Sequence, residues 1–386
     1  MTGVRFRKAA TPHGELQGWS SEDPGGVLLW DAPLYRTVTS WLERVFRAHL
    51  AAARAIWEPA PAQFARTLGL GEQLAAEVPV EWDDDSVGFC RVDFVLEAGR
   101  PTVLEMNVGT SAGGSIDVEA WARRVGPSIG ARPHHARLRW VARRASELGA
   151  CRVVIPVWPW LATGDPERYF ASTRHHLGEL GFSSDLVPLL EVPHCVDRER
   201  DVALRLFAVQ DALAHGLAPR DYGYGRESQV RWLCGEFATA LSSKALLAAT
   251  ALQRSDAPLV PQTRVLGNAP PGLEGIPVED AVALRDDLVL KPVDELGGTG
   301  VAIGRTTAPD VWASLCRGAR PGGWVVQRVA TPDVVHTPRG PAAAVWGAYL
   351  VEGRASGMLA RFLPGGRGDC VINGHTGALL TAAVAR

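Results

Sequence analysis

The chain is almost without lysine. Of the 40 lysine and arginine residues among its 386, only three are lysines, namely Lys8, Lys244 and Lys291. Arginine therefore supplies nearly every positive charge. A compact ammonium and a planar guanidinium are not interchangeable beside phosphate oxygens. The two lysines retained in the second half of the chain are therefore candidates for phosphate binding.

Other features that identify particular classes of protein are also missing. No apolar run approaches the length of about 20 residues that a membrane span needs, and the first residues, MTGVRFRK, lack the apolar centre of a secretory signal. A net charge of −2 argues against a generally basic, nucleic-acid-binding surface. The six cysteines lack CxxC spacing, so they indicate neither a zinc site nor a disulfide framework. We expect a cytoplasmic protein with no nucleic-acid or membrane partner.

Two adjacent segments predict a β-hairpin. Residues 89–96 read as a strand, residues 97–101 as the turn, and residues 102–107 as the returning strand. Side chains alternate between the two faces of a strand. The hairpin therefore gathers its polar residues on one face above an apolar underside.

The polar face of this hairpin has the composition of a cation site. Arg91 and Asp93 share one face of the first strand, and Val103, Glu105 and Asn107 share one face of the second. Two carboxylates and an amide oxygen suit Mg²⁺, and an arginine beside them can hold a phosphoryl oxygen. Taken alone, the pattern is more typical of an amphipathic hairpin with a solvated charged face.

A second motif, LVLKPVDELGGTG, has the chemistry of a phosphate site. Residues 288–290 form a short apolar strand leading to Lys291, and residues 301–303 are the expected return. The glycines between them allow a tight loop whose N–H groups can approach an anion, and Glu295 lies within the loop. The motif is not a Walker A sequence, because no Lys-Ser/Thr follows the glycines. A plain hairpin turn would also need glycine.

In this order the motifs resemble those of the circularly permuted ATP-grasp ligases, a group that includes eukaryotic glutathione synthetase and glutathionylspermidine synthetase. Glu105-Met-Asn107 comes first, then Lys244, then Lys291-Pro with Glu295 and the glycines. The similarity covers residues 86–120 and 236–386, including the segments that resemble the closing strands of the family, namely 345–350, 357–361 and 370–374.

The resemblance implies a role for each matching residue. It implies ATP and Mg²⁺ as cofactors, with a metal-binding set of Asp93, Glu105, Asn107 and Glu295. It implies ATP contacts from Lys244, Lys291 and Glu295, from Gly297 and Gly298 in a lid over the phosphates, and from Gln327, Arg328 and Val329 at the adenine. Arg91 and Arg361 would hold the transferring phosphoryl group or the acyl phosphate.

We therefore expect an α/β (α+β) fold with an ATP-grasp core. The expected parts are an N-terminal helical segment (1–85), a first part of the core with the metal hairpin (86–150), a small open-sheet β-α-β substrate lobe (151–230), and the ATP-binding part of the core (231–386).

The expected activity is an ATP-dependent carbon–nitrogen ligase. Such an enzyme joins a small-molecule carboxylate to an amine (an amino acid, a peptide or a polyamine-like compound) through an acyl phosphate, and releases ADP and phosphate. Two alternatives remain open, a non-catalytic ATP-binding regulatory protein and a phosphotransferase on the same fold. The oligomeric state is also open, a homodimer included.

Overall fold

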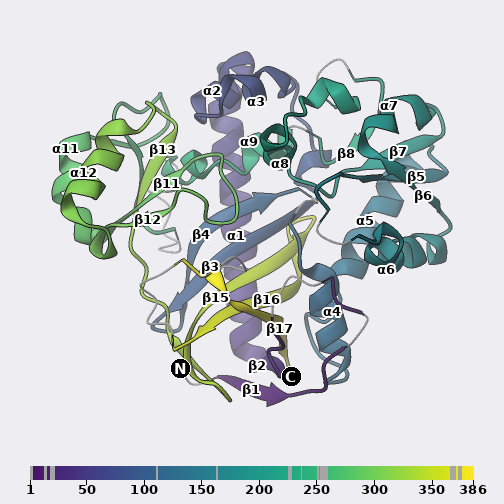
Figure 1. Ribbon diagram of the computed structural model, residues 1–386, viewed down its shortest axis with the longest axis horizontal. Coiled ribbons are helices and arrows are strands. Elements are labelled where there is room, and N and C mark those ends of the chain that lie inside the picture. Colours follow the sequence, from purple (N-terminus) through teal and green to yellow (C-terminus); the bar gives the residue numbers. More distant parts are fainter. Residues whose placement is uncertain are drawn as a thin grey trace.

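The computed structural model describes residues 3–12, 15–17, 22–109, 112–161, 164–224, 228–235, 237–249, 252, 260–365, 371–372 and 376–386. Within these residues the strands form sheets of eight, five and four strands. The largest sheet lies at the centre, with the five-stranded sheet and its helices on one side of it and the four-stranded sheet on the other (Figure 1).

The central sheet combines segments from the two ends of the chain with the expected hairpin. Its order is β1-β2-β17-β16-β15-β3-β4, with β14 paired to β15, and among these pairs β2 and β17 are parallel. The strands are β1 (Val4–Lys8), β2 (Gly26–Trp30), β3 (Phe89–Glu97), β4 (Arg100–Val108), β14 (Val334–Thr337), β15 (Gly340–Val351), β16 (Arg354–Pro364) and β17 (Leu379–Ala385).

The five-stranded sheet carries the glycine-rich loop. Its order is β10-β9-β13-β11-β12, and the helices α11 and α12 share a buried apolar cluster with it. The elements are β9 (Thr263–Leu266), β10 (Gly275–Ile276), β11 (Leu288–Pro292), β12 (Ala302–Ile303), β13 (Trp324–Arg328), α11 (Val278–Ala283) and α12 (Pro309–Gly318).

The four-stranded sheet is the open sheet expected from the β-α-β pattern. Its order is β6-β5-β7-β8, and its three strand pairs are parallel. The elements are β5 (Arg152–Val157), β6 (Ser183–Pro188), β7 (Asp201–Leu204) and β8 (Trp232–Leu233), with α5 (Pro133–Glu147), α6 (Pro166–Glu179), α7 (Val192–Cys195) and α8 (Val209–Ala214).

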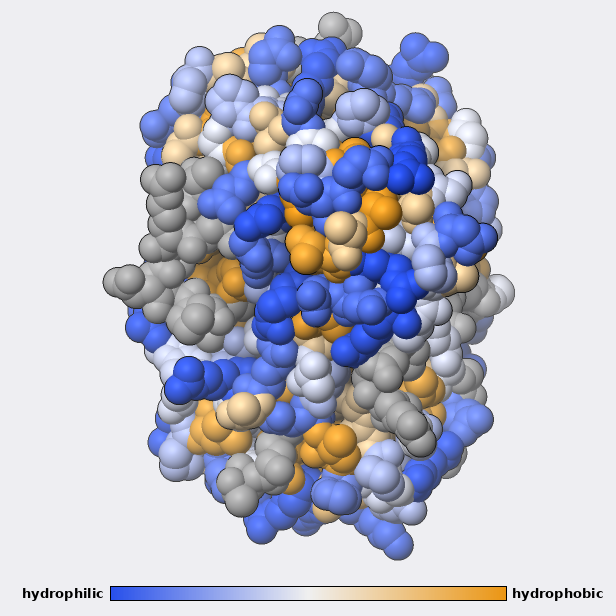
Figure 2. Space-filling view, turned by 90° about the vertical axis from the view of Figure 1, so that its left-hand side faces the viewer, coloured by the Kyte–Doolittle hydropathy of each residue, from blue (hydrophilic) through white to orange (hydrophobic). Residues whose placement is uncertain are grey.

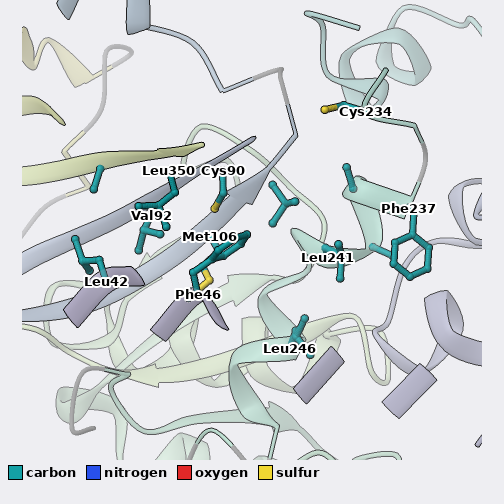
Figure 3. Close-up of a cluster of buried hydrophobic side chains, with 14 of the residues drawn as sticks. Leu42, Phe46, Cys90, Val92, Met106, Cys234, Phe237, Leu241, Leu246 and Leu350 are labelled. Atoms are coloured by element: carbon teal, nitrogen blue, oxygen red, sulfur yellow. The ribbon is translucent and has the colours of Figure 1, made fainter. Parts of the chain in front are cut away.

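The long helix α1 (Ala32–Trp57) covers the apolar face of the central sheet. Its buried residues recur every three or four positions, which places them on one stripe of the helix. In Figure 3, Leu42 and Phe46 of α1 lie against Val92 of β3 and Met106 of β4. Burial of a side chain of this size stabilises the fold by about 1.5–3 kcal/mol. The polar residues of the hairpin lie on the opposite face of the sheet.

The remaining elements are short, apart from α4 beside the central sheet. The α-helices are α2 (Phe64–Thr67), α3 (Glu72–Glu77), α4 (Ser115–Arg123) and α9 (Phe237–Leu241). The 3₁₀ helices are η1 (Pro61–Gln63), η2 (Asp85–Val87), η3 (Leu189–Glu191), η4 (Pro219–Tyr222), η5 (Lys244–Ala248), η6 (Arg285–Asp287) and η7 (Gly304–Thr306).

The N-terminal segment contains more than the expected helices. The strands β1 and β2 precede α1 and join the central sheet. Of the segments that resemble closing strands, 345–350 lies in β15 and 357–361 in β16, whereas most of 370–374 lies outside the described residues. No helix in the described part of the chain combines the length and the apolar character that crossing a membrane requires.

Candidate functional site

The hairpin has the register that brings the polar residues together. Arg91 of β3 lies opposite Asn107 of β4, and Asp93 lies opposite Glu105. Opposite residues of an antiparallel pair point to the same face of the sheet. The predicted cluster is therefore formed by neighbouring side chains.

The prediction is wrong for one residue of the polar face, Val103. Asp93 pairs with Glu105 but Phe94 pairs with Val103, so Leu104 is an extra residue in β4, a β-bulge. The bulge reverses the alternation, and Val103 packs into the apolar core under α1. It also leaves the Leu104 carbonyl oxygen to accept a hydrogen bond from Lys291 Nζ at 3.2 Å. The bulge at Leu104 thus contacts Lys291 of the glycine-rich motif.

The polar cluster lies between two apolar patches on the same face of the sheet. At one end, Phe89 and Tyr349 pack with α4. At the other end, Val95 and Val345 form a second buried cluster, against which Leu104 packs. The patches exclude water from both sides of the cluster, so the charges between them interact more strongly than charges in bulk water.

Asp93 is the centre of this cluster. Its carboxylate accepts two hydrogen bonds from Arg91, at 2.7 and 2.8 Å, and one from Arg361 Nη2 at 2.7 Å. The Asn107 amide nitrogen donates to it at 3.2 Å, which turns the amide oxygen the other way. Burial alone would raise the pKa of Asp93, but the charges of Arg361 and Arg91 outweigh burial and lower that pKa to about 2. The carboxylate is therefore ionised at neutral pH.

Sequence reasoning missed the glycine that makes room for this pair. Gly347 of β15 lies opposite Asp93 of β3. A Cβ atom at this position would lie 2.8 Å from Asp93 Oδ1 and 2.9 Å from Arg91 Cδ. The sequence Val345-Trp-Gly predicts only a strand, because nothing in it tells which residue the glycine will face.

Lys244 connects the hairpin to the glycine-rich loop. It begins η5, after Ser243, whose hydroxyl accepts from the Ala245 N–H and caps this turn. Its buried Nζ lies 3.7 Å from Glu105 Oε2 and donates to the Glu295 carbonyl oxygen at 2.5 Å. Three segments far apart in the sequence therefore converge on one ammonium group.

Lys291 approaches the same strand from β11. Its Nζ donates to Gln327 Oε1 at 2.6 Å, in addition to the Leu104 carbonyl. Burial, and to a lesser extent the charge of Lys244, lowers the pKa of Lys291 to about 8, against the attraction of Glu105. Both retained lysines of the second half of the chain are thus buried at one site.

A small cleft opens beside Lys244. Residues of β4, α8, α9, η5 and the glycine-rich segment line it, among them Glu105, Asn107, Gln210, Lys244 and Glu295. Gln210 Nε2 donates to the Asp294 carbonyl at 3.1 Å, so the four-stranded lobe touches the glycine-rich segment across the cleft.

The glycine-rich loop needs its glycines. Gly297, Gly298 and Gly300 have φ values of 63°, 79° and 71°, a region that side chains with a Cβ rarely adopt. At Gly300 a Cβ would also lie 2.8 Å from Pro292 Cγ. The loop connects β11 and β12, which pair antiparallel as expected.

The predicted adenine strand runs beside Lys291. Gln327 accepts the hydrogen bond from Lys291 through its Oε1 atom, and its amide nitrogen donates to Thr263 Oγ1 at 3.0 Å. Arg328 pairs instead with Glu97 near the tip of the hairpin, at 2.7 Å. The Val329 N–H donates to the Asp287 carbonyl at 2.8 Å.

The acidic residues do not form a metal site by themselves. Over the described residues, no three His, Cys, Asp or Glu side chains come together as a cation-binding group. Glu105 and Asn107 offer oxygen atoms at the cleft, as does the exposed Glu295. Mg²⁺ commonly completes such a set with water and substrate phosphates, so the donors fit that ion.

A buried arginine near the cleft was also missed. Arg205 follows β7 at the carboxyl end of the parallel sheet and is 2 % exposed. Its Nε donates to the Cys234 carbonyl at 2.7 Å, and a Cβ at Gly109 would lie 3.0 Å from its Nη2. The apolar run that becomes β7 was the available signal, because ligands of open α/β sheets bind beyond the carboxyl ends of the strands.

Comparison with known proteins identifies the fold. No family model and no curated protein matches the chain. Among solved structures, it is similar to a glutathione synthetase-like effector from Globodera pallida in its apo form, with a TM-score of 0.58 and 9% identity over 94% of this chain and 89% of that one. A putative gamma-glutamylcysteine synthetase from Methylobacillus flagellatus KT has a TM-score of 0.49 and 12% identity over 86% of each chain.

The chain thus shares the fold of this glutathione synthetase-like protein, and its mixed helices and sheets confirm the expected α/β fold class.

Proposed function

We propose that the protein is an ATP-dependent carboxylate–amine ligase that forms ADP and phosphate. The observation that carries the proposal is the convergence of Lys244 and Lys291, two of the three lysines of the chain, beside Glu105. Four cationic side chains gather here against the carboxylates of Asp93 and Glu105, namely those of Lys244, Lys291, Arg91 and Arg361. An excess of positive charge in a partly buried site favours a polyanion.

The residues are suited to Mg-ATP. Glu105, Asn107 and Glu295 would hold Mg²⁺ through oxygen, and the metal role of Asp93 stays a prediction because its carboxylate is bonded to two guanidinium groups. A bound Mg²⁺ would neutralise phosphate charge. Lys244 and Lys291 would hold phosphate oxygens.

The glycine-rich segment and β13 would complete the nucleotide site. Gly297 and Gly298 would cover the phosphates and exclude water, with Glu295 beside them. The adenine would lie along the strand formed by Gln327, Arg328 and Val329.

The reaction would proceed in two displacements. An oxygen of the substrate carboxylate attacks the γ-phosphorus, the bond to the β–γ bridging oxygen breaks, and ADP leaves. The amine nitrogen then attacks the carbonyl carbon of the acyl phosphate, loses a proton, and displaces phosphate. Arg91 and Arg361 would offset the charge on the transferring group. The carboxylate and the amine would be an amino acid, a peptide or a polyamine-like compound.

The test is substrate-dependent release of ADP and phosphate. The protein is incubated with Mg-ATP and pools of amino acids, small peptides and polyamines, and release is measured for each pool. The ligase requires both a carboxylate and an amine. Phosphate transfer to a stable acceptor without amine dependence would support a phosphotransferase. ATP binding without turnover in every pool would favour the non-catalytic regulatory protein.

Two substitutions test the site itself. Glu105→Gln and Lys291→Met should each reduce turnover by about 10²-fold or more, since each removes a charge that acts on the transferring group. Lys8→Ala is the matched control, because Lys8 is the remaining lysine and is exposed. Near-normal activity in both site variants would refute this assignment.

A further inference from the structure

The outer side of α12 is an uncharged strip on the surface of the five-stranded lobe. Val311 is 48% exposed and Leu315 38% exposed, whereas Trp312 and Cys316 of the same helix are buried. Apolar residues gather in the middle of this side of the molecule, with hydrophilic residues around them (Figure 2).

The strip has the spacing of a helix-packing face. Val311, Ser314, Leu315 and Gly318 are all exposed and follow one another at i, i+3, i+4 and i+7, which places them on one side of a helix. Ser314 and Gly318 are small, so another helix can approach closely and pack against Val311 and Leu315.

Opposite charges border this strip on one flank. Asp310 and Arg317 are both exposed, and they are seven positions apart, which is about two turns at 3.6 residues per turn. They therefore lie on the same flank of α12, one near each end. The Arg317 guanidinium is held there by Glu279 of α11, at 2.8 and 2.9 Å.

We propose that α12 is a self-association face that binds α12 of a second copy of this chain, antiparallel about a two-fold axis. Along the helix, the point halfway between Asp310 and Arg317 lies within one residue of the point halfway between Val311 and Leu315. The charged pair and the apolar pair are therefore centred on the same two-fold axis. An antiparallel copy therefore places Asp310 opposite the partner's Arg317 and Arg317 opposite the partner's Asp310, while the apolar pairs meet at the axis. A surface that is complementary to itself in this way is what a two-fold interface requires.

The interface is small. A helix of ten residues is about 15 Å long, and contacts of this size lie at the low end of specific interfaces. The dimer therefore forms reversibly and depends on protein concentration. This proposal stands independently of the catalytic one, because α12 is not part of the proposed ATP site.

The test is sedimentation velocity across a concentration series with charge-reversal variants. Asp310→Arg and Arg317→Asp each place like charges at both symmetric contacts, so each variant alone should be monomeric where the wild type dimerises. An equimolar mixture of the two variants restores both opposite-charge contacts and should dimerise. Circular dichroism and thermal unfolding verify that each variant is folded.

Glu279→Gln is the matched control, because it removes the contact between Arg317 and α11 without changing the strip, and it should keep the dimer. Leu315→Glu should increase the dissociation constant at least tenfold. A monomeric wild type at every concentration, or a mixture of folded charge-reversal variants that stays monomeric, would overturn the proposal.

Discussion

The Asp93 carboxylate on β3 lies 2.7 Å from the Arg361 guanidinium on β16, although 268 positions separate the two residues in the sequence. The contact spans the intervening strand β15, where Gly347 leaves the space for it. With Arg91 it forms one charge cluster in which each guanidinium depends on the same carboxylate. Four predictions follow from this cluster and from Lys291 beside it.

Asp93→Asn should destabilise the protein strongly. The substitution leaves Arg91 and Arg361 largely buried without their counter-charge, and breaking a buried ion pair in this way costs about 3–5 kcal/mol. Urea denaturation monitored by circular dichroism measures the loss. The matched control is Glu279→Gln, which removes a carboxylate from the exposed pair with Arg317 and should leave the denaturation midpoint unchanged. Equal effects of the two substitutions would contradict the energetic role of Asp93.

Acid should remove the stabilisation that Asp93 provides. The pKa of Asp93 in the folded protein, about 2, lies below its ordinary value of 3.8. The contribution to stability is therefore complete above pH of about 4 and is lost as the pH falls towards 2. Denaturation curves at a series of pH values should show a smaller loss in Asp93→Asn than in the wild type over this window. An identical pH dependence in the two proteins would count against this assignment.

Lys291→Met should abolish the proposed turnover without destabilising the protein. The pKa of Lys291, about 8, lies below its ordinary value of 10.5. Burying the charged ammonium therefore destabilises the folded protein in full below pH 8, and this cost decreases as the pH rises towards 10.5. Methionine keeps the apolar stem and lacks the charge, although the contact with Gln327 is lost. At pH 7 the variant should be as stable as the wild type or up to about 2 kcal/mol more stable. Thermal unfolding is the measurement, and a large drop in the midpoint would show that Lys291 is structural.

Gly347→Ala should disturb the charge cluster by steric overlap alone. The added Cβ would overlap Asp93 and Arg91, and overpacking of this kind costs about 1–3 kcal/mol. Turnover should fall with stability, because the guanidinium groups are displaced. Gly178→Ala is the control, since Gly178 lies in α6 with open space around its missing Cβ, and alanine is the better helix former. A neutral Gly347→Ala variant would show that the cluster tolerates displacement.

Local patterns in the sequence predicted the hairpin, the parallel lobe and the loop between β11 and β12. Alternation placed Arg91, Asp93, Glu105 and Asn107 on one face because their register depends only on a short turn. No pattern in the sequence predicts the bulge at Leu104, because the extra residue is of the same apolar type as other residues of the strand. Consequently Val103 was predicted on the wrong face.

Contacts between distant segments could not be derived from the residues. Nothing in the sequence around Asp93 or Arg361 indicates that β3 and β16 flank the same strand, and the pairing of β2 with β17 is equally remote. Gly347 was missed for the same reason. What each residue faces depends on strand order, which the family resemblance supplied only in outline.

The wide separation of β3 from β15 and β16 in the sequence also affects how the protein is made. The ribosome adds about 5–20 residues per second, so the 268 positions between Asp93 and Arg361 correspond to about 10–50 s of synthesis. During this time the hairpin of β3 and β4 has emerged with an unpaired edge that carries the charged side chains of Arg91 and Asp93. A charge beside an open strand edge disfavours pairing with other chains, so we expect the charged pair that organises the site in the finished protein also to protect the nascent hairpin.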